Sequence, residues 1–235
     1  MSFSAKFVLA VLWAVIITGL CRGESEIARL EAYYYGKCNQ TGDLRKFEKL
    51  RTDAYEMYKY AEFAINLLPD STETFCKNHR PKLIERADEL KNDLNQCLPA
   101  GRHFFGKFVK DSIVEILHFL CHNNAEKTRR FFTQGGPDCM KTLEEPSSSN
   151  LDNCFNRIFA PSSNFITKVE LCEDIAVARK CFERLVDDSC RIGSMRQLNR
   201  EFFTYVSKPC SSSYMAISAN ALLLFVILSI VSIVS

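Results

Sequence analysis

Ten cysteines between residues 38 and 210 constrain the fold of this chain more than any other feature of its sequence. An eleventh, Cys21, follows an apolar run from Phe7 to Leu20. Lys6 precedes that run and small residues lead to a cleavage point after Gly23, which is the layout of a secretory signal peptide. The run is shorter than the roughly 18 apolar residues that a membrane anchor needs. We therefore predict that residues 1–23 are removed on secretion, together with Cys21.

The remaining cysteines form an even set in a secreted chain, which predicts a disulfide framework made in an oxidising compartment. Ten cysteines allow about 945 pairings, so the sequence leaves the connectivity of the five expected bridges open. No paired CxxC or Cys₂His₂ spacing is present, which argues against a zinc site. The expected bridge residues are Cys38, Cys76, Cys97, Cys121, Cys139, Cys154, Cys172, Cys181, Cys190 and Cys210.

Residues 24–210 are predicted to form one cysteine-rich extracellular domain. Of the 30 basic residues of the chain, Lys6 and Arg22 lie in the signal peptide, so this region has as many basic residues as the 28 acidic ones. A net charge of zero gives no electrostatic footprint for nucleic acid, and we expect no nucleic-acid partner. The region is long enough to bury a real hydrophobic core, so the bridges are expected to add rigidity to it.

Apolar residues recur at helical spacing in several stretches. In the clearest helix, from Pro81 to Pro99, alternating steps of four and three give a buried stripe of Leu83, Ala87, Leu90, Leu94 and Cys97. Further helices are predicted over 43–68, 102–121, 169–186 and 195–205, with a short one over 151–159. Alternating strand patterns are scarce, so we predict an all-α, disulfide-rich single domain of about seven helices.

Two of these helices have a predicted buried face. The face of the 43–68 helix comprises Leu44, Phe47, Ala54, Tyr58, Ala61, Ile65 and Leu68. The face of the 102–121 helix comprises Phe105, Val109, Ile113, Ile116 and Leu120.

Three cysteines in the 169–190 region are spaced nine residues apart. Nine residues make two and a half helical turns, so Cys172, Cys181 and Cys190 point alternately to opposite sides of a continuous helix. They therefore cannot pair with one another and are expected to join this helix to different neighbours, with Cys190 beyond a break near Asp187–Asp188.

The stretch from Leu117 to Cys139 is predicted to contain a sharp turn. An apolar helix runs into Cys121, and a short charged segment then carries the Phe131–Phe132 pair. Two adjacent glycines before Pro137 do not fit a helix interior, so the chain is expected to turn there, with Cys139 holding the turn. A polar connection over 144–150, with Pro146 and three serines, follows it.

Near the start of the domain lie three neighbouring tyrosines, predicted to face the core, and a glycosylation sequon, predicted to lie at the surface. Tyr33, Tyr34 and Tyr35 are expected to pack against the core, with an exposed aromatic patch as the alternative. Asn39-Gln40-Thr41 is a glycosylation sequon beside Gly42, so Asn39 is a predicted glycosylation site in a surface turn.

Several cysteine-bearing phrases have a distinctive order and spacing: FCKNHRP at 75–81, NQCLP at 95–99, LHFLC at 117–121, FFTQGGPDC at 131–139 and YVSKPC at 205–210. In these phrases the chain resembles the insect 27 kDa haemolymph glycoprotein family over most of its ectodomain, from about residue 40 to 210, and GGPDC is the most specific of them. Members of that family are secreted, helical and cysteine-rich, with no established biochemical activity, so the resemblance implies fold and secretion. The family is largely soluble, whereas this chain continues into an apolar tail, which argues against a purely haemolymph location.

The sequence contains no catalytic signature, and we expect neither an enzyme nor a cofactor. His118 and His122 lie four apart on one helix, but HFLCH lacks the acid of an HExxH motif, so we interpret them as polar residues flanking an apolar stripe. No GxSxG elbow or phosphate-binding glycine loop is present, and the cysteines are expected to be consumed in bridges.

A basic run, Lys127, Arg129 and Arg130, lies beside the Phe131–Phe132 pair. Such a run can receive a carboxylate or a glycan sulfate, but we interpret it as solvated charge.

The last residues, 211–235, are predicted to be a signal for a glycosylphosphatidylinositol (GPI) anchor. Ser211 is the expected attachment site because the next two residues are also small, and a spacer and the apolar run from Ala221 to Val234 follow. The alternative is a membrane-spanning helix over 215–235, but it would end without a single Lys or Arg on its cytoplasmic side.

Two functions remain open at this point. The first is non-enzymatic recognition of an extracellular protein, glycan or lipid by a head displayed on the outer face of the plasma membrane through a lipid anchor. The second is a secreted carrier with an apolar cavity for a small hydrophobic molecule, which the 18 phenylalanines suggest, although core packing explains them equally well.

Overall fold

The computed structural model describes residues 24–68, 70–144, 154, 167–190 and 192–211. The predicted signal peptide, the tail beyond Ser211, the 145–150 connection and the short helix over 151–159 lie outside these residues, apart from Cys154. Every regular element in the described residues is helical, and seven helices have nine residues or more, which confirms the predicted all-α fold.

The longer helices follow one another along the whole described chain. They are α2 (Glu24–Gln40), α3 (Leu44–Ile65), α5 (Arg80–Gln96), α6 (Phe104–Thr133), α7 (Gly136–Glu144), α9 (Lys168–Ser189) and α10 (Gly193–Val206). The short elements are α4 (Thr72–Thr74), the π-helical turn η1 (Phe75–His79), the 3₁₀ turn η2 (Ala100–Arg102) and α11 (Lys208–Ser211). None of the helices described is both long enough and apolar enough to cross a membrane.

Local sequence signals explain where several helices begin. At the start of α9 the Thr167 hydroxyl accepts a hydrogen bond from the Glu170 backbone N–H, and the Glu170 carboxylate accepts one from the Thr167 backbone N–H. This capping box satisfies two amide groups that the first helical turn leaves without partners. Pro81 lies in the first turn of α5, where a proline removes no intrahelical hydrogen bond.

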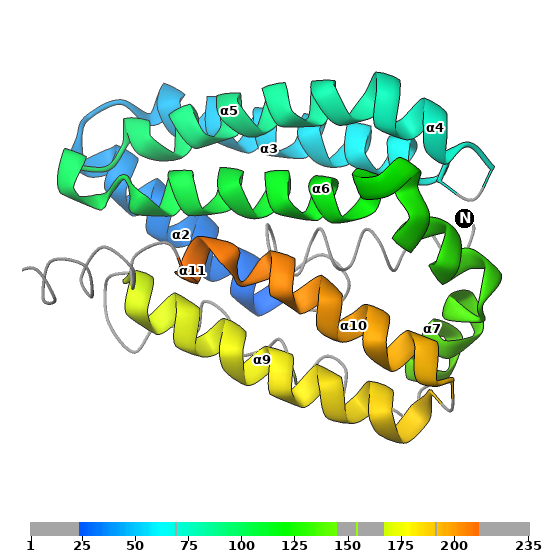
Figure 1. Ribbon diagram of the computed structural model, residues 1–235. Helices are drawn as coiled ribbons and strands as arrows, with labels where there is room; N and C mark the ends of the chain where they lie inside the picture. Colours follow the sequence, from blue (N-terminus) through cyan, green and yellow to red (C-terminus); the bar gives the residue numbers. More distant parts are fainter. Residues whose placement is uncertain (1–23, 69, 145–153, 155–166, 191, 212–235) are drawn as a thin grey trace, which may run out of the picture.

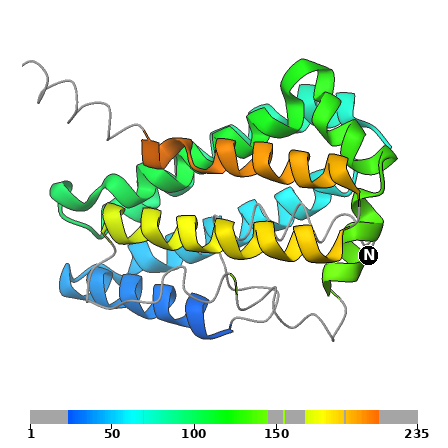
Figure 2. The same ribbon diagram turned by 60° about the horizontal axis from the view of Figure 1, so that its bottom comes forward.

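Helix α6 lies at the centre of the bundle. It packs against α5 on one side, with α3 beyond α5, and against α10 on the other side, with α9 beyond α10 (Figure 1). Helices α9 and α10 lie side by side, and α11 is at the same end of this pair as the start of α9 (Figure 2). Helix α7 is at the opposite end of the bundle, where it contacts α6 and α9.

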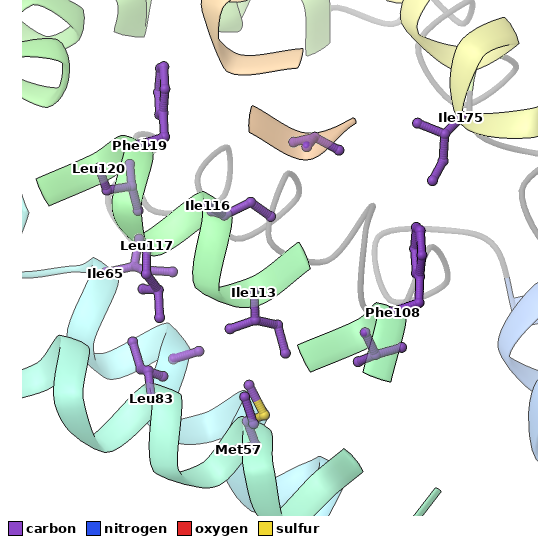
Figure 3. Close-up of a cluster of buried hydrophobic side chains, with 14 of the residues drawn as sticks. Met57, Ile65, Leu83, Phe108, Ile113, Ile116, Leu117, Phe119, Leu120 and Ile175 are labelled. Atoms are coloured by element: carbon purple, nitrogen blue, oxygen red, sulfur yellow. The ribbon is translucent and has the colours of Figure 1, made fainter. Parts of the chain in front are cut away.

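One hydrophobic cluster runs through the described chain from Tyr34 to Val206. Ile113 and Leu117 of α6 face Ile65 of α3 and Leu83 of α5 (Figure 3). The predicted stripes of α5 and α6 are confirmed, because every member of both is buried.

The predicted buried face of α3 is only partly right. Phe47, Ala61 and Ile65 are buried, but Leu44 is 38% exposed. Met57, which the prediction omitted, is 4% exposed. Helix α3 contacts both α2 and α5, so its buried surface is wider than the single stripe that one neighbour would require.

Five disulfides connect all ten predicted cysteines: Cys38–Cys97, Cys76–Cys121, Cys139–Cys190, Cys154–Cys181 and Cys172–Cys210. The three cysteines spaced nine residues apart bond to three different segments, which confirms the prediction from their spacing. Helix α9 continues through Asp187–Asp188 to Ser189, so Cys190 follows the end of the helix directly rather than an earlier break.

The three neighbouring tyrosines lie on α2 and differ in burial. Tyr34 is 2% exposed and packs in the core, Tyr33 is half-buried, and Tyr35 is 47% exposed. The prediction that all three pack against the core is therefore wrong for Tyr35, because successive residues of a helix point in different directions.

Candidate functional site

Helix α6 contains a sharp break after its first half. His122 has an extended backbone (ψ 144°), and Asn123, Asn124 and Ala125 all have positive φ angles of 50–59°. Asparagine adopts this left-handed conformation more readily than most residues, because its short polar side chain can form local hydrogen bonds. The Thr128 hydroxyl donates a 2.7 Å hydrogen bond to the Leu120 carbonyl across the break. The two halves of α6 therefore run in different directions, and the second half leads to α7 (Figure 1).

The predicted turn lies between α6 and α7 and depends on its two glycines. Gly135 has a φ of 83°, a conformation that other residues rarely adopt. A Cβ atom on Gly136 would lie 2.3 Å from the ring of Phe131, so only glycine leaves room for that side chain. Gly136 and Pro137 are the first residues of α7, so the turn precedes them, and the Cys139–Cys190 bridge holds α7 against the end of α9.

An apolar cavity lies where both halves of α6 meet α7, α9 and α10. Its volume is about 70 Å³, and about 700 Å³ when all the empty space within it is counted, open solvent included. The buried part of its lining includes Ile116, Phe119, Met140, Phe182, Met195 and Leu198. Half-buried side chains also line it, and they are Lys127, Phe131, Phe132, Asn199 and Phe202.

Lys127 is the only charged side chain among the described residues that line the cavity. Its Nζ atom lies 3.3 Å from the Tyr205 hydroxyl oxygen and 3.5 Å from Oε2 of Glu201. It also lies 4.5 Å from the centroid of the Tyr205 ring, and the Lys127 side chain is only 18% exposed. The interpretation of Lys127 as solvated charge is therefore wrong, whereas Arg129 beside it is exposed as predicted.

A second lysine approaches the same tyrosine ring from α11. The Lys208 Nζ atom lies 4.1 Å from the Tyr205 ring centroid and 2.6 Å from Oε2 of Glu115. Both ammonium groups are within the range of cation–π attraction. Lys208 does not line the cavity, so both lysines lie over the same ring but only Lys127 reaches the cavity.

His118 and His122 lie together on α6, outside the cavity lining. Their ring centroids are 5.1 Å apart, and His118 Nδ1 is 4.0 Å from Glu115 Oε2. Burial lowers the pKa of His118, electrostatic repulsion from His122 and Lys208 lowers it further, and the Glu115 carboxylate acts in the opposite direction. Within the described ranges, no three His, Cys, Asp or Glu side chains are placed to hold a metal ion.

The two predicted modification sites are both exposed. Asn39 lies in the last turn of α2, so it is helical, and the surface turn begins after it, at Thr41 and Gly42. Ser211 is the last residue of α11 and follows the Cys172–Cys210 bridge directly.

The cavity is the feature that the sequence analysis did not locate. Its lining comes from four helices, and the spacing of residues within one helix does not show which helices meet. Five of the 18 phenylalanines contribute to it, namely Phe119, Phe131, Phe132, Phe182 and Phe202. The number of phenylalanines was thus the one feature of the sequence that indicated an apolar cavity, but it did not indicate where in the fold the cavity lies.

Comparison with known families gives one match. A family model described as "Protein of unknown function (DUF1397)" matches residues 66–211. This range includes the whole cavity lining and both halves of α6, and it leaves out α2 and α3. Comparison with curated proteins and with solved structures finds no match.

Proposed function

The chain belongs to the DUF1397 family of proteins of unknown function, and from this premise we propose an extracellular binding protein whose helical head holds a small apolar molecule. The observation that carries the proposal is the cavity between α6, α7, α9 and α10. Ligand sites are typically concave and mostly apolar, with a few polar groups that orient the ligand. This cavity has that composition, with Lys127 and Asn199 among its few polar side chains.

The proposed function is non-enzymatic, and the side chains in the cavity support this. The Thr128 hydroxyl donates its hydrogen bond to a backbone carbonyl. Cys139 forms a disulfide and is therefore not a nucleophile. The remaining polar side chains of the lining, Lys127 and Asn199, can donate hydrogen bonds to a ligand but have no general base beside them in the lining.

The proposed location is the outer face of the plasma membrane, through a lipid anchor on Ser211. An exposed Ser211 at the end of α11, followed by two further serines, supports it. We also propose a glycan on the exposed Asn39, and kinship with the insect 27 kDa haemolymph glycoproteins. All five phrases that carry this resemblance lie inside the 66–211 range.

The size of the cavity limits the ligand. A dry cavity of about 150 Å³ in another protein admits benzene. The present cavity, at about 70 Å³, is roughly half as large. It therefore suits one end of a slender chain, and the rest of such a ligand would lie against half-buried side chains of the lining such as Phe131, Phe132 and Phe202.

Binding of decan-1-ol, measured by calorimetry, tests the proposed function. The secreted chain ending at Ser211 is suitable because it retains the whole core cluster and all five bridges. Leu198→Trp puts an indole ring into the cavity and should abolish binding. Val177→Trp, on the exposed face of α9, is the matched control and should bind normally.

Two results would contradict the proposal. One is the absence of decan-1-ol binding to the wild-type chain. The other is equal binding by the Leu198 and Val177 variants, provided that both unfold at similar temperatures.

The proposed anchor has its own test. Phosphatidylinositol-specific phospholipase C should release the head from intact cells that express the full chain. A protein that stays on the cells and still carries residues 222–234, as detected by mass spectrometry, would show a membrane span instead.

Recognition of a glycan or protein by the head surface is the second candidate, and the aromatic face of α3 favours it. Tyr55 is 60% exposed and Phe63 is 56% exposed. Exposed aromatic side chains are common where proteins bind partners. If this candidate is right, Tyr55→Ala with Phe63→Ala will remove binding to cell-surface extracts, whereas Leu198→Trp will not.

A further inference from the structure

Lys127 of α6 is the one charged side chain among the described residues that line the cavity. A lysine ammonium has three hydrogen-bond donors and no acceptor. Tyr205 and Glu201 lie near two of the Lys127 donors, which leaves the third for another acceptor.

The charge of Lys127 is only partly balanced. Its 3.5 Å separation from Glu201 is longer than the 2.7–2.9 Å of a strong charge-assisted hydrogen bond. The Lys127 side chain is mostly buried beside the apolar rings of Phe119 and Tyr205, where charges interact more strongly than in water. A ligand oxygen that carries a negative charge would therefore gain more from this lysine than a neutral hydroxyl would.

We propose that the ligand is an unbranched aliphatic carboxylate, with its carboxylate at Lys127 and its chain in the apolar cavity. This inference rests on the proposed function of the cavity and adds the chemical class of the ligand. The small volume favours a straight chain over a ring system. Met140 and Met195 in the lining are unbranched and adaptable, so they can adjust to a flexible chain.

The test compares two ligands with the same chain, decanoate and decan-1-ol, at pH 7.5 on the chain ending at Ser211. The quantity of interest is the Kd for decan-1-ol divided by the Kd for decanoate, because the shared chain cancels from this ratio. A hydrogen bond to a charged group contributes enough for about a tenfold change in Kd. Lys127→Gln is therefore expected to lower the ratio about tenfold.

Lys208→Gln is the matched control. It removes the same charge from a lysine that also lies over the Tyr205 ring but does not line the cavity. We expect this variant to change the ratio less than about twofold, because a charge outside the cavity is screened by water and salt.

A second variant acts in the opposite direction. Glu201 competes with a ligand carboxylate for Lys127, and its own negative charge repels that carboxylate. Glu201→Gln is therefore expected to raise the ratio several-fold. If the Lys127–Glu201 pair had a purely structural role, both variants would bind decan-1-ol and decanoate more weakly by similar factors. The Kd ratio would then be the same in Lys127→Gln and Glu201→Gln.

The outcomes distinguish this inference from the proposed function. If the wild-type chain binds decan-1-ol but the ratio is the same in the wild type, Lys127→Gln and Lys208→Gln proteins, the carboxylate assignment is wrong and the apolar cavity stands. If the chain binds neither ligand, the proposed function itself fails. A lower ratio in the Lys127 variant together with a higher one in the Glu201 variant supports the assignment.

Discussion

Replacement of Gly106 by alanine tests how closely α5 and α6 pack. Gly106 lies near the start of α6, facing α5. A Cβ atom at this position would lie 2.8 Å from the Lys91 carbonyl oxygen and 2.6 Å from Oδ1 of Asn95. Real Cβ contacts are essentially never shorter than 3.0 Å, so something must move. The Asn95 side chain can rotate, but the Lys91 carbonyl belongs to the backbone of α5, so the two helices must separate.

Two opposing effects set the magnitude. Overpacking of a well-packed core typically lowers the free energy of unfolding by about 1–3 kcal/mol. Alanine favours a helix interior over glycine by about 0.8–1.0 kcal/mol, which offsets part of that loss. The net effect is that Gly106→Ala should be less stable by up to about 2 kcal/mol. For a domain of this size, a loss of about 2 kcal/mol corresponds to a melting temperature about 4–8 °C lower.

Gly36→Ala is the control because it makes the same substitution inside α2 with nothing within 4 Å of the new Cβ. Only the helix-propensity effect applies there, so this variant should be as stable as the wild type or more stable. Thermal and urea unfolding of the oxidised proteins measure both effects. If the two variants shift the melting temperature in the same direction by similar amounts, the close approach of α5 to α6 is not as described.

Three further predictions concern charges and bridges. Lys49→Met leaves the Asp93 carboxylate, which is 2% exposed, without the ammonium group that lies 2.8 Å from it. Urea unfolding should show a free energy of unfolding lower by about 1–3 kcal/mol, towards the lower end because Lys49 itself is 55% exposed. The Lys110 and Lys91 hydrogen bonds lower the pKa of Asp88. Asp88→Asn should therefore lower the free energy of unfolding by at most about 1 kcal/mol near pH 6, and this difference from the wild type should vanish as the pH falls below about 3. Replacing both Cys172 and Cys210 by serine removes a bridge with a sequence separation of 38. Calorimetry should show a free energy of unfolding lower by about 2–4 kcal/mol, whereas an unchanged melting temperature would mean that the two cysteines are not bonded.

The sequence predicted those parts of the fold that depend on one helix at a time. The buried stripes of α5 and α6 follow from apolar spacing because residues three and four apart lie on one side of a helix. Helix α6 also buries residues outside the predicted stripe, such as Phe108 and Phe119, because it has neighbours on two sides. The turn at Gly135 follows from backbone sterics, which are local. The nine-residue spacing on α9 excluded bonds among Cys172, Cys181 and Cys190 because helical geometry fixes their relative directions.

Features that need two or more helices were beyond such reasoning. The face of α3 was partly wrong because α2 and α5 cover different sides of it. The Phe131–Phe132 segment turned out to be the second half of α6, since three left-handed residues allow the helix to resume after a change of direction. No periodicity in the sequence indicates that change of direction.

The sequence by itself determined an all-α fold, the residues that form the five bridges and the position of the main turn, because these follow from local sterics, helical periodicity and cysteine number. Only the tertiary structure decided which cysteines pair and where the apolar cavity lies. It also decided that Lys127 is at that cavity, whereas Lys208 is outside it. The physical reason is that pairing and cavity lining depend on distances between helices far apart in the chain, and these distances are set by the packing of the whole bundle.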